Sequence, residues 1–163
     1  MNVESRDSVS FKPAELDEFA QLLAGNGLAL TDAQIDLQIE AFPLAVVDAY
    51  VDNYRRNDKQ ACLDLFAPDA VWHDPVGEPP HVGHEGIGAF WDQSHSLAES
   101  IVLEPADVIV CANQAAMVFE IHVTLAGGST MIMDAVEVFV IDDDARIAGL
   151  SAYWDMSRAR TRA

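Results

Sequence analysis

The second half of the chain has strand character almost throughout, and this pattern constrains the fold more than any other feature. From Ile101 onward, runs rich in β-branched and other apolar residues follow one another along the sequence. Short turn signals break this run at three places, which are residues 112–113, 127–128 and 142–144. Strand-like runs separated by tight turns are typical of strands that pair with their neighbours in the chain. The sequence therefore predicts an antiparallel meander in this half.

The first half is patterned for helices instead. Apolar residues recur every three or four positions in residues 1–42, which predicts two short helices there. Pro43 suits the first turn of a third helix, because proline lacks the N–H that this turn leaves unpaired. Tyr50 lies on the apolar stripe of that helix and is expected to face inward. A fourth short helix is expected to carry residues 61–66 and to end before a turn at residues 68–69.

The pattern of residues 70–73 predicts a brief strand, followed by a loop rich in proline and glycine and a helix near residues 85–95. Helices first and strands afterwards indicate an α+β fold, with the helices on one face of a curved sheet. We expect one compact domain over residues 43–156. In this prediction residues 1–42 form a helical extension, and residues 157–163 form a basic, solvated tail.

The chain is strongly acidic, with 27 acidic and 9 basic residues and a formal net charge of −18. Such a charge repels polyanions, so we expect no nucleic-acid partner and no phosphate, nucleotide or acyl-CoA substrate, whereas neutral apolar molecules are unaffected. The apolar runs fall far short of the roughly 20 residues that a membrane helix needs. The first residues lack the pattern of a secretory signal. The sequence therefore predicts a cytoplasmic protein without a membrane partner.

Cysteine and histidine give no sign of a metal or redox site. Cys62 and Cys111 lie in no paired motif and have apolar neighbours, so we expect buried free thiols. The five histidines form neither an HxH nor an HExxH pattern. The sequence contains no nucleophile elbow, phosphate-binding loop or dinucleotide fingerprint. We therefore expect neither a metal nor another cofactor.

Two carboxylates stand out in the strand expected at residues 131–140. Alternation places Glu137 on one face and Asp134 on the other, and each face is otherwise apolar. A buried carboxylate must be paired or become neutral, so at least one of the two acids is expected to have a raised pKa. An acid on a solvated face or beside an arginine would be ordinary. Periodicity alone leaves both assignments open.

Asp74 is a third candidate for chemistry. It follows Trp72 by two residues, so the two share a side if the strand continues, and an aspartate beside a large aromatic in a dry site can act as a base. An aspartate before proline is also a common turn residue. Tyr50 alone would likewise be an ordinary core tyrosine. None of these residues is diagnostic by itself.

Two segments together resemble the ketosteroid isomerases, within the nuclear-transport-factor-2-like and SnoaL-like superfamily. The segment VWHDPVGEPPHVGHEGIGAFW resembles the catalytic strand, loop and helix of that family, and MDAVEVFVIDDDARIAGLSAYWD resembles its last hairpin. The resemblance covers about residues 46–156. It implies a cone-shaped α+β fold in which helices pack on a strongly curved, mostly antiparallel sheet and enclose an apolar pocket.

The resemblance also implies roles for individual residues. The general base of the family falls on Asp74, its oxyanion tyrosine falls on Tyr50, and its protonated acid falls on Glu137, where the family has aspartate. A carboxylic acid kept neutral by an apolar site is a known property of that family. Some isomerases support the oxyanion tyrosine with two further tyrosines, and the matching positions here are Phe66 and Trp91. Tyr50 would then lack that support.

The implied pocket has a wall of aromatic and apolar residues, which could equally be plain core residues. The residues assigned to this wall are Tyr54, Phe66, Trp72, Phe90, Trp91, Met117, Phe119, Met133, Ala135, Phe139, Leu150, Ala152 and Trp154. We expect an apolar small molecule as the ligand and a homodimer as the assembly.

The leading hypothesis is a cofactor-free isomerase that moves the C=C bond of a 3-oxo-Δ5 steroid, or of a similar β,γ-unsaturated ketone, through a dienolate. Asp74 would carry the proton, and Tyr50 with neutral Glu137 would bind the developing enolate oxygen. Two alternatives stay open at this point: a polyketide cyclase or hydratase/dehydratase that uses the same aspartate, and a non-catalytic binding protein. A limonene-type epoxide hydrolase is disfavoured, because Ala152 occupies a position at which those enzymes need aspartate.

Overall fold

The computed structural model describes residues 30–162, with side chains from residue 43 onward. The chain divides into two compact units, Met1–Gln38 and Ile39–Ala163. In the first unit the described residues are the opening turns of helix α2, and the helix expected earlier in the extension lies outside the described residues. The second unit holds every residue that the sequence proposes for the site.

Helix α2 runs without interruption over Leu30–Arg56, so the helix start expected at Pro43 is wrong. Pro43 lies inside the helix, where a proline removes one backbone hydrogen bond at a cost of about 3 kcal/mol but does not oblige the helix to end. The apolar stripe in the second half of the helix is confirmed. Its buried residues are Val46, Val47, Tyr50, Val51 and Tyr54.

Helix α3 spans Lys59–Asp64, and strand β1 follows over Phe66–His73. The expectation of a helix through residue 66 and a turn at 68–69 is therefore wrong, because Phe66 and both turn residues belong to the strand. The pairing register of β1 shifts between Phe66 and Val71. Such an irregularity lets a strand accept a proline without a missing ladder bond.

Strand β2 covers only His81–Val82 and pairs with β1, inside the segment expected to be a loop. Helix α4 follows over Gly83–Ser96 and contains the helix expected near residues 85–95. Gly83 adopts a φ of 65°, and a Cβ atom there would lie 3.0 Å from the carbonyl oxygen of Pro68. This junction therefore requires glycine.

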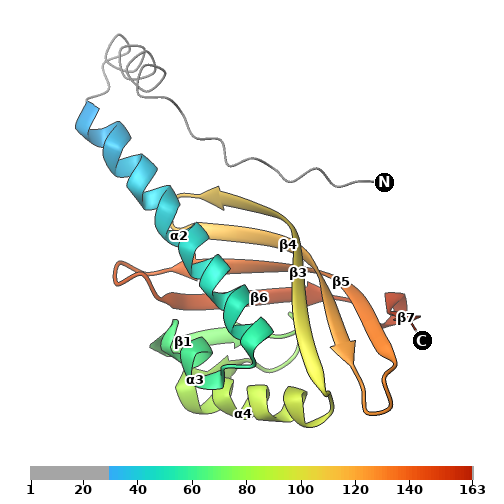
Figure 1. The fold of residues 1–163 in the computed structure, drawn as a ribbon. Helices are drawn as coiled ribbons and strands as arrows, with labels where there is room; N and C mark the ends of the chain where they lie inside the picture. The colour runs from blue at the N-terminus through green and yellow to red at the C-terminus, as the bar shows by residue number, and fades with distance from the viewer. Residues whose placement is uncertain (1–29, 163) are drawn as a thin grey trace, which may run out of the picture. The chain divides into compact units, whose positions relative to one another are not determined.

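The antiparallel meander is confirmed. Consecutive strands pair antiparallel, and they are β3 (Ser100–Cys111), β4 (Gln114–Thr124), β5 (Thr130–Ile141) and β6 (Ile147–Trp154). Strand β1 joins β6 in parallel, so the described residues form one mostly antiparallel sheet with the order β2-β1-β6-β5-β4-β3 (Figure 1). The second half of α2 crosses one face of this curved sheet (Figure 1). The expected α+β fold is confirmed.

The C-terminal residues are exposed, as the sequence suggests, but residues 156–162 do not form a free tail. A short 3-10 helix, η1, covers Met156–Arg158, and strand β7 covers Arg160–Arg162 and pairs with β5. Arg160 also forms ion pairs with Asp134 and Glu120. Backbone pairing and these two carboxylates hold the segment against the sheet.

The two cysteines differ in their exposure. Cys62 is buried as expected, whereas Cys111 is exposed at the end of β3, and both are free thiols. The expectation for Cys111 is wrong because it pairs with exposed Gln114 next to the turn of a hairpin. Among the described residues, no helix is long and apolar enough to cross a membrane.

Candidate active site

The pairing of β5 with its two neighbours decides which of its two acids is buried. Glu137 lies opposite Met117 on β4 and Ala152 on β6, and both of these residues are buried. Glu137 itself is only 3% exposed. Asp134 lies on the opposite face, where it accepts two hydrogen bonds from the Arg160 guanidinium at 3.1 and 2.9 Å. The buried acid of the strand is therefore Glu137.

Glu137 shares a hydrogen bond with Tyr50. The hydroxyl of Tyr50 donates to Oε1 of Glu137 at 3.3 Å, whereas Oε2 is buried without a hydrogen-bond partner among the described residues. Burial and then the charge of Asp74 raise the pKa of Glu137 well above its usual value, although the hydrogen bond from Tyr50 opposes this rise. These effects favour the neutral carboxylic acid, whose proton is available to a ligand.

Aromatic rings surround Tyr50, which is 1% exposed. Its ring centroid lies 5.3 Å from that of Phe139 and 6.4 Å from those of Phe66 and Trp72. Burial, followed by the nearby charge of Glu137, raises the pKa of Tyr50 well above its usual value. Tyr50 therefore keeps its proton at neutral pH and can act as a hydrogen-bond donor.

Asp74 comes directly after β1, close to the end of the adjacent strand β6 because His73 pairs with Ser151. The indole N–H of Trp154 donates to Oδ1 of Asp74 at 2.6 Å. Burial raises the pKa of Asp74 to about 6, and the hydrogen bond from Trp154 limits this rise. A carboxylate with this pKa is ionised at neutral pH and lies near the range that general base catalysis favours.

Asp74, Tyr50 and Glu137 open into one cavity of about 130 Å³. The remaining wall is mostly apolar, and the hydroxyl of Ser94 on it donates to backbone carbonyls of its own helix. The lining residues are Tyr50, Tyr54, Asp74, Phe90, Ser94, Ile101, Leu103, Ile121, Val123, Met133, Glu137 and Trp154. The cavity thus combines a basic carboxylate and two donors with a hydrophobic wall.

Part of the expected wall lines this cavity, and part packs behind it. Tyr54, Phe90, Met133 and Trp154 line the cavity. The other expected wall residues are buried in the surrounding core, and they are Phe66, Trp72, Trp91, Met117, Phe119, Ala135, Phe139, Leu150 and Ala152. Their size and burial hold the three polar groups in place.

Five lining residues are absent from the expected wall. Met117 and Phe119 face inward on β4, and Ile121 and Val123 continue this alternation. The period of a strand could therefore have predicted them as lining residues. Ser94 lies one helical turn after Phe90, so helical spacing contains a signal for it as well. Ile101 and Leu103 become lining residues because β3 pairs them with Val123 and Ile121. That pairing is a tertiary feature.

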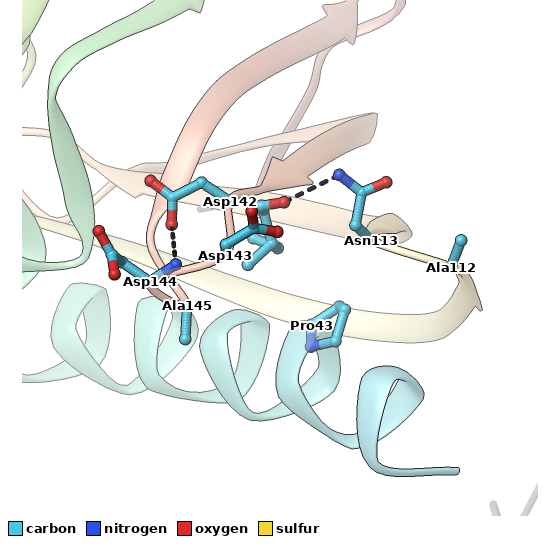
Figure 2. A pocket seen from close by; sticks show the side chains of 8 residues that line it. Pro43, Ala112, Asn113, Asp142, Asp143, Asp144 and Ala145 are labelled. Atoms are coloured by element: carbon cyan, nitrogen blue, oxygen red, sulfur yellow. Dashed lines mark hydrogen bonds between the residues drawn. The ribbon is translucent and has the colours of Figure 1, made fainter. Parts of the chain in front are cut away.

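A larger hollow of about 560 Å³ lies elsewhere, between helix α2 and two hairpin turns (Figure 2). The carboxylate of Asp142 accepts hydrogen bonds there from the backbone N–H groups of Asp144 and Arg146, and Asn113 donates to the carbonyl of Ile141. These polar groups hold the turns in place. The described residues contain no group of three His, Cys, Asp or Glu side chains that could hold a metal ion.

The fold and the cavity define an α+β protein whose curved sheet carries a mostly apolar cavity with three polar groups. Residues 47–150 match the SnoaL-like domain family, and this range contains all three polar groups of the site. A steroid Δ-isomerase from Nocardioides simplex is 32% identical over 111 residues, which cover 68% of this chain and 87% of that protein. The chain belongs to the SnoaL-like family.

Solved structures share the fold at lower sequence identity. SalBIII, an epoxide hydrolase/cyclase-like enzyme in pyran ring formation in polyether salinomycin, has a TM-score of 0.71 at 18% identity, over 77% of this chain and 99% of that one. A Mycobacterium tuberculosis protein in complex with estradiol-17beta-hemisuccinate has a TM-score of 0.66 at 20% identity, over 73% and 98%. A computationally designed 17-OHP binder has a TM-score of 0.67 at 19% identity, over 74% and 98%.

Proposed function

We propose that this cavity isomerises a β,γ-unsaturated ketone, such as a 3-oxo-Δ5 steroid, to its conjugated isomer. The observation that carries the proposal is the arrangement of Asp74 in one cavity with the hydrogen-bonded pair of Tyr50 and Glu137. The sequence similarity to a steroid Δ-isomerase supports the same reaction. In this proposal Asp74 is the base, and Tyr50 and Glu137 share the role of oxyanion donors.

The reaction is a proton transfer within one substrate, so atoms and electrons balance without a co-reactant. Asp74 removes a proton from the carbon between the carbonyl and the alkene, and the electron pair of that C–H bond moves onto the carbonyl oxygen. The resulting dienolate collapses to the conjugated ketone as protonated Asp74 returns the proton to the far alkene carbon. Asp74 ends as the carboxylate with which it began.

The neutral state of Glu137 matters because the site then carries one negative charge throughout. The charge starts on Asp74, moves to the substrate oxygen and returns. Hydrogen bonds from Tyr50 and from the acid proton of Glu137 stabilise the oxygen at the stage when it is negative. An ionised Glu137 would place a second negative charge in a poorly solvated cavity and would repel the dienolate.

The direct test follows the appearance of conjugated-enone absorbance when the purified protein is mixed with a 3-oxo-Δ5 steroid. We expect turnover by the native chain and a large loss in the Asp74→Asn variant. Asp155→Asn is the matched control, because Asp155 is an exposed acid beside Trp154 whose carboxylate only caps the η1 turn. Binding of the steroid without any enone signal would refute the isomerase proposal and favour a non-catalytic binding protein.

A cyclase is the second candidate, and the shared fold with SalBIII favours it. A cyclase would use the same basic Asp74 to activate a nucleophile of its substrate, so the Asp74→Asn loss does not separate the two functions. The distinguishing result is the product. A ring-closed product from a polyether-type precursor, together with no enone from a β,γ-unsaturated ketone, would replace the isomerase by a cyclase.

We also propose that two copies of the chain pair through the outer face of the sheet. Val118, Val136 and Tyr153 form one uncharged row across three strands of this face, and Val118 and Tyr153 are exposed. Two strongly acidic chains can approach most easily where neither carries charge. Sedimentation should show a dimer that Val118→Asp weakens, whereas Leu97→Asp, at an exposed apolar residue after α4, leaves it unchanged. A monomer in the native chain would contradict this proposal.

A further inference from the structure

A second tyrosine lies in the cavity beside Tyr50. Tyr54 is one helical turn further along α2, is only 6% exposed and lines the same cavity. The ring centroids of Tyr50 and Tyr54 are 5.0 Å apart with an interplanar angle of 56°. Residues four positions apart on a helix are direct neighbours, so this contact is built into the helix.

The hydroxyl of Tyr54 is surrounded by the polar groups of the site. Its ring contacts that of Tyr50, and the charges of Glu137 and Asp74 act on its hydroxyl. Burial, followed by the charges of Cys62 and Glu137, raises the pKa of Tyr54 well above its usual value. Tyr54 is therefore a neutral phenol with one proton to donate.

The single hydroxyl proton of Tyr50 limits the hydrogen bonds that Tyr50 can donate. Tyr50 has a single hydroxyl proton, which it directs at Oε1 of Glu137 when no ligand is bound. To donate to a ligand oxygen, Tyr50 must turn this proton away, and its own oxygen then accepts a hydrogen bond from another donor. Among the rings in contact with Tyr50, which are Tyr54, Phe66, Trp72 and Phe139, Tyr54 carries the only hydroxyl in the described part of the chain.

Helix α4 packs against the side chain of Tyr54 and restricts its rotation. The ring of Trp91 lies 4.6 Å from that of Tyr54, and the ring of His95 lies 5.9 Å from it. His95 is in turn stacked on Trp91 at 4.1 Å, and its Nδ1 lies 2.9 Å from the carbonyl oxygen of Trp91. The ring of Tyr54 is thus held against helix α4 and in contact with the ring of Tyr50.

We propose that Tyr54 is the positioning residue of the oxyanion hole, and that its hydroxyl donates to Tyr50 when Tyr50 donates to the ligand oxygen. The proposal rests on the proposed function of Tyr50 as an oxyanion donor. In this proposal Tyr54 acts by orienting the hydroxyl of Tyr50, and it does not touch the reacting atoms of the substrate. The hydroxyl that supports Tyr50 therefore comes from its own helix, since Phe66 and Trp91 have none.

The first test uses tyrosine labelled with ¹³C at Cζ, because the chain contains only three tyrosines. In Tyr54→Phe the ring and its packing remain and the hydroxyl is lost, so we expect the Tyr50 signal to move while the exposed Tyr153 signal stays in place. Tyr153→Phe is the matched control and should leave Tyr50 unchanged. An unmoved Tyr50 signal in a folded Tyr54→Phe variant would overturn the proposal, whatever reaction the cavity performs.

The second test is kinetic and separates this inference from the proposed function. Tyr54→Phe should lower kcat by about 3- to 10-fold, the size of one ordinary hydrogen bond, with KM unchanged. Tyr50→Phe should lower kcat by about 10²–10³-fold, because a direct oxyanion donor is lost. An enone-forming enzyme with an unchanged kcat in Tyr54→Phe would overturn the positioning role alone. If Tyr54→Phe does not fold, NMR of the native chain replaces it. A contact between the hydroxyl protons of Tyr50 and Tyr54 would support the positioning role, and the absence of that contact would contradict it.

Discussion

Asp134 and Glu137 lie three residues apart on strand β5 and have opposite chemical environments. Asp134 is exposed, and the Arg160 guanidinium holds the pKa of its carboxyl below the usual value. Glu137 is buried opposite Met117 and Ala152, and burial raises its pKa well above the usual value. One strand therefore carries an ionised acid on its outer face and an acid driven towards neutrality on its inner face. The difference shows that neighbouring strands, rather than residue type, set the chemistry of an acid.

The largest effect should follow from removing the base that faces the cavity. Asp74→Asn keeps the shape of the side chain but cannot accept a proton, so we expect turnover to fall by about 10²–10⁴-fold. Asp134→Asn, on the outer face of the sheet, should leave turnover unchanged. Steady-state enone formation measures both variants. Equal loss in the two variants would show that the inner and outer faces do not differ in the way described.

The next largest effect concerns the inner acid itself. Glu137→Ala should lower kcat by about 10²–10³-fold, because one donor to the oxyanion is lost. Glu137→Gln should lose less, since its amide N–H can still donate. Glu120→Gln is the matched control on the outer face, where Glu120 pairs with Arg160. A Glu137→Ala variant as active as the native chain would remove Glu137 from the site.

The pH dependence of the rate should report Asp74. Its pKa is raised to about 6, and only the ionised form accepts a proton. We therefore expect kcat/KM to rise with pH, to increase about 10-fold from pH 5 to pH 7, and to level off above that. The Tyr50 and Glu137 donors keep their protons in this range and should not add a second step. A rate that falls between pH 5 and 7 would contradict the assignment of Asp74 as the base.

Stability should change with pH in opposite directions for the two kinds of acid. Asp74 has a raised pKa in the folded state, so the folded chain binds more protons than the unfolded chain and loses stability as the pH rises towards 6. The Asp74→Asn variant should not show this loss. In the native chain it amounts to about 1 kcal/mol of the free energy of unfolding between pH 5 and pH 8. Asp134 has a lowered pKa, so its contribution is lost only as the pH falls. Urea unfolding at pH 5 and pH 8 measures the sign for Asp74, and unfolding at about pH 3 and pH 5 measures the sign for Asp134. Equal signs for the two acids would contradict their opposite environments.

Spacing along the chain predicted the parts of the site that depend on one element. Tyr50 lies on an apolar stripe with the period of a helix, and Glu137 lies on an alternating strand, so each could be assigned to a face. The choice between Glu137 and Asp134 could not be made, because both faces of β5 are apolar in sequence. It required the pairing of β5 with β4 and β6, which is a contact between distant segments.

The errors at element boundaries have the same physical origin. Phe66 suits either a helix or a strand by local pattern, and it belongs to β1 because that strand pairs in parallel with the distant β6. Arg160 looks like part of a solvated tail until β7 pairs with β5 and brings it to Asp134. Pro43 suits a helix start by local pattern, yet it lies inside a long helix, which can accept one proline in its interior. Tertiary pairing overrides local preference in the first two cases.

The protonation state of Glu137 tests the central claim most directly. Infrared difference spectroscopy of the ligand-free native chain against Glu137→Gln at neutral pH isolates the carboxyl band of this residue, with Asp134→Asn against the native chain as the reference for an ionised acid. We predict a protonated C=O stretch for Glu137 and a carboxylate band for Asp134. A carboxylate band for Glu137 at neutral pH would contradict the neutral inner acid and the oxyanion hole built on it.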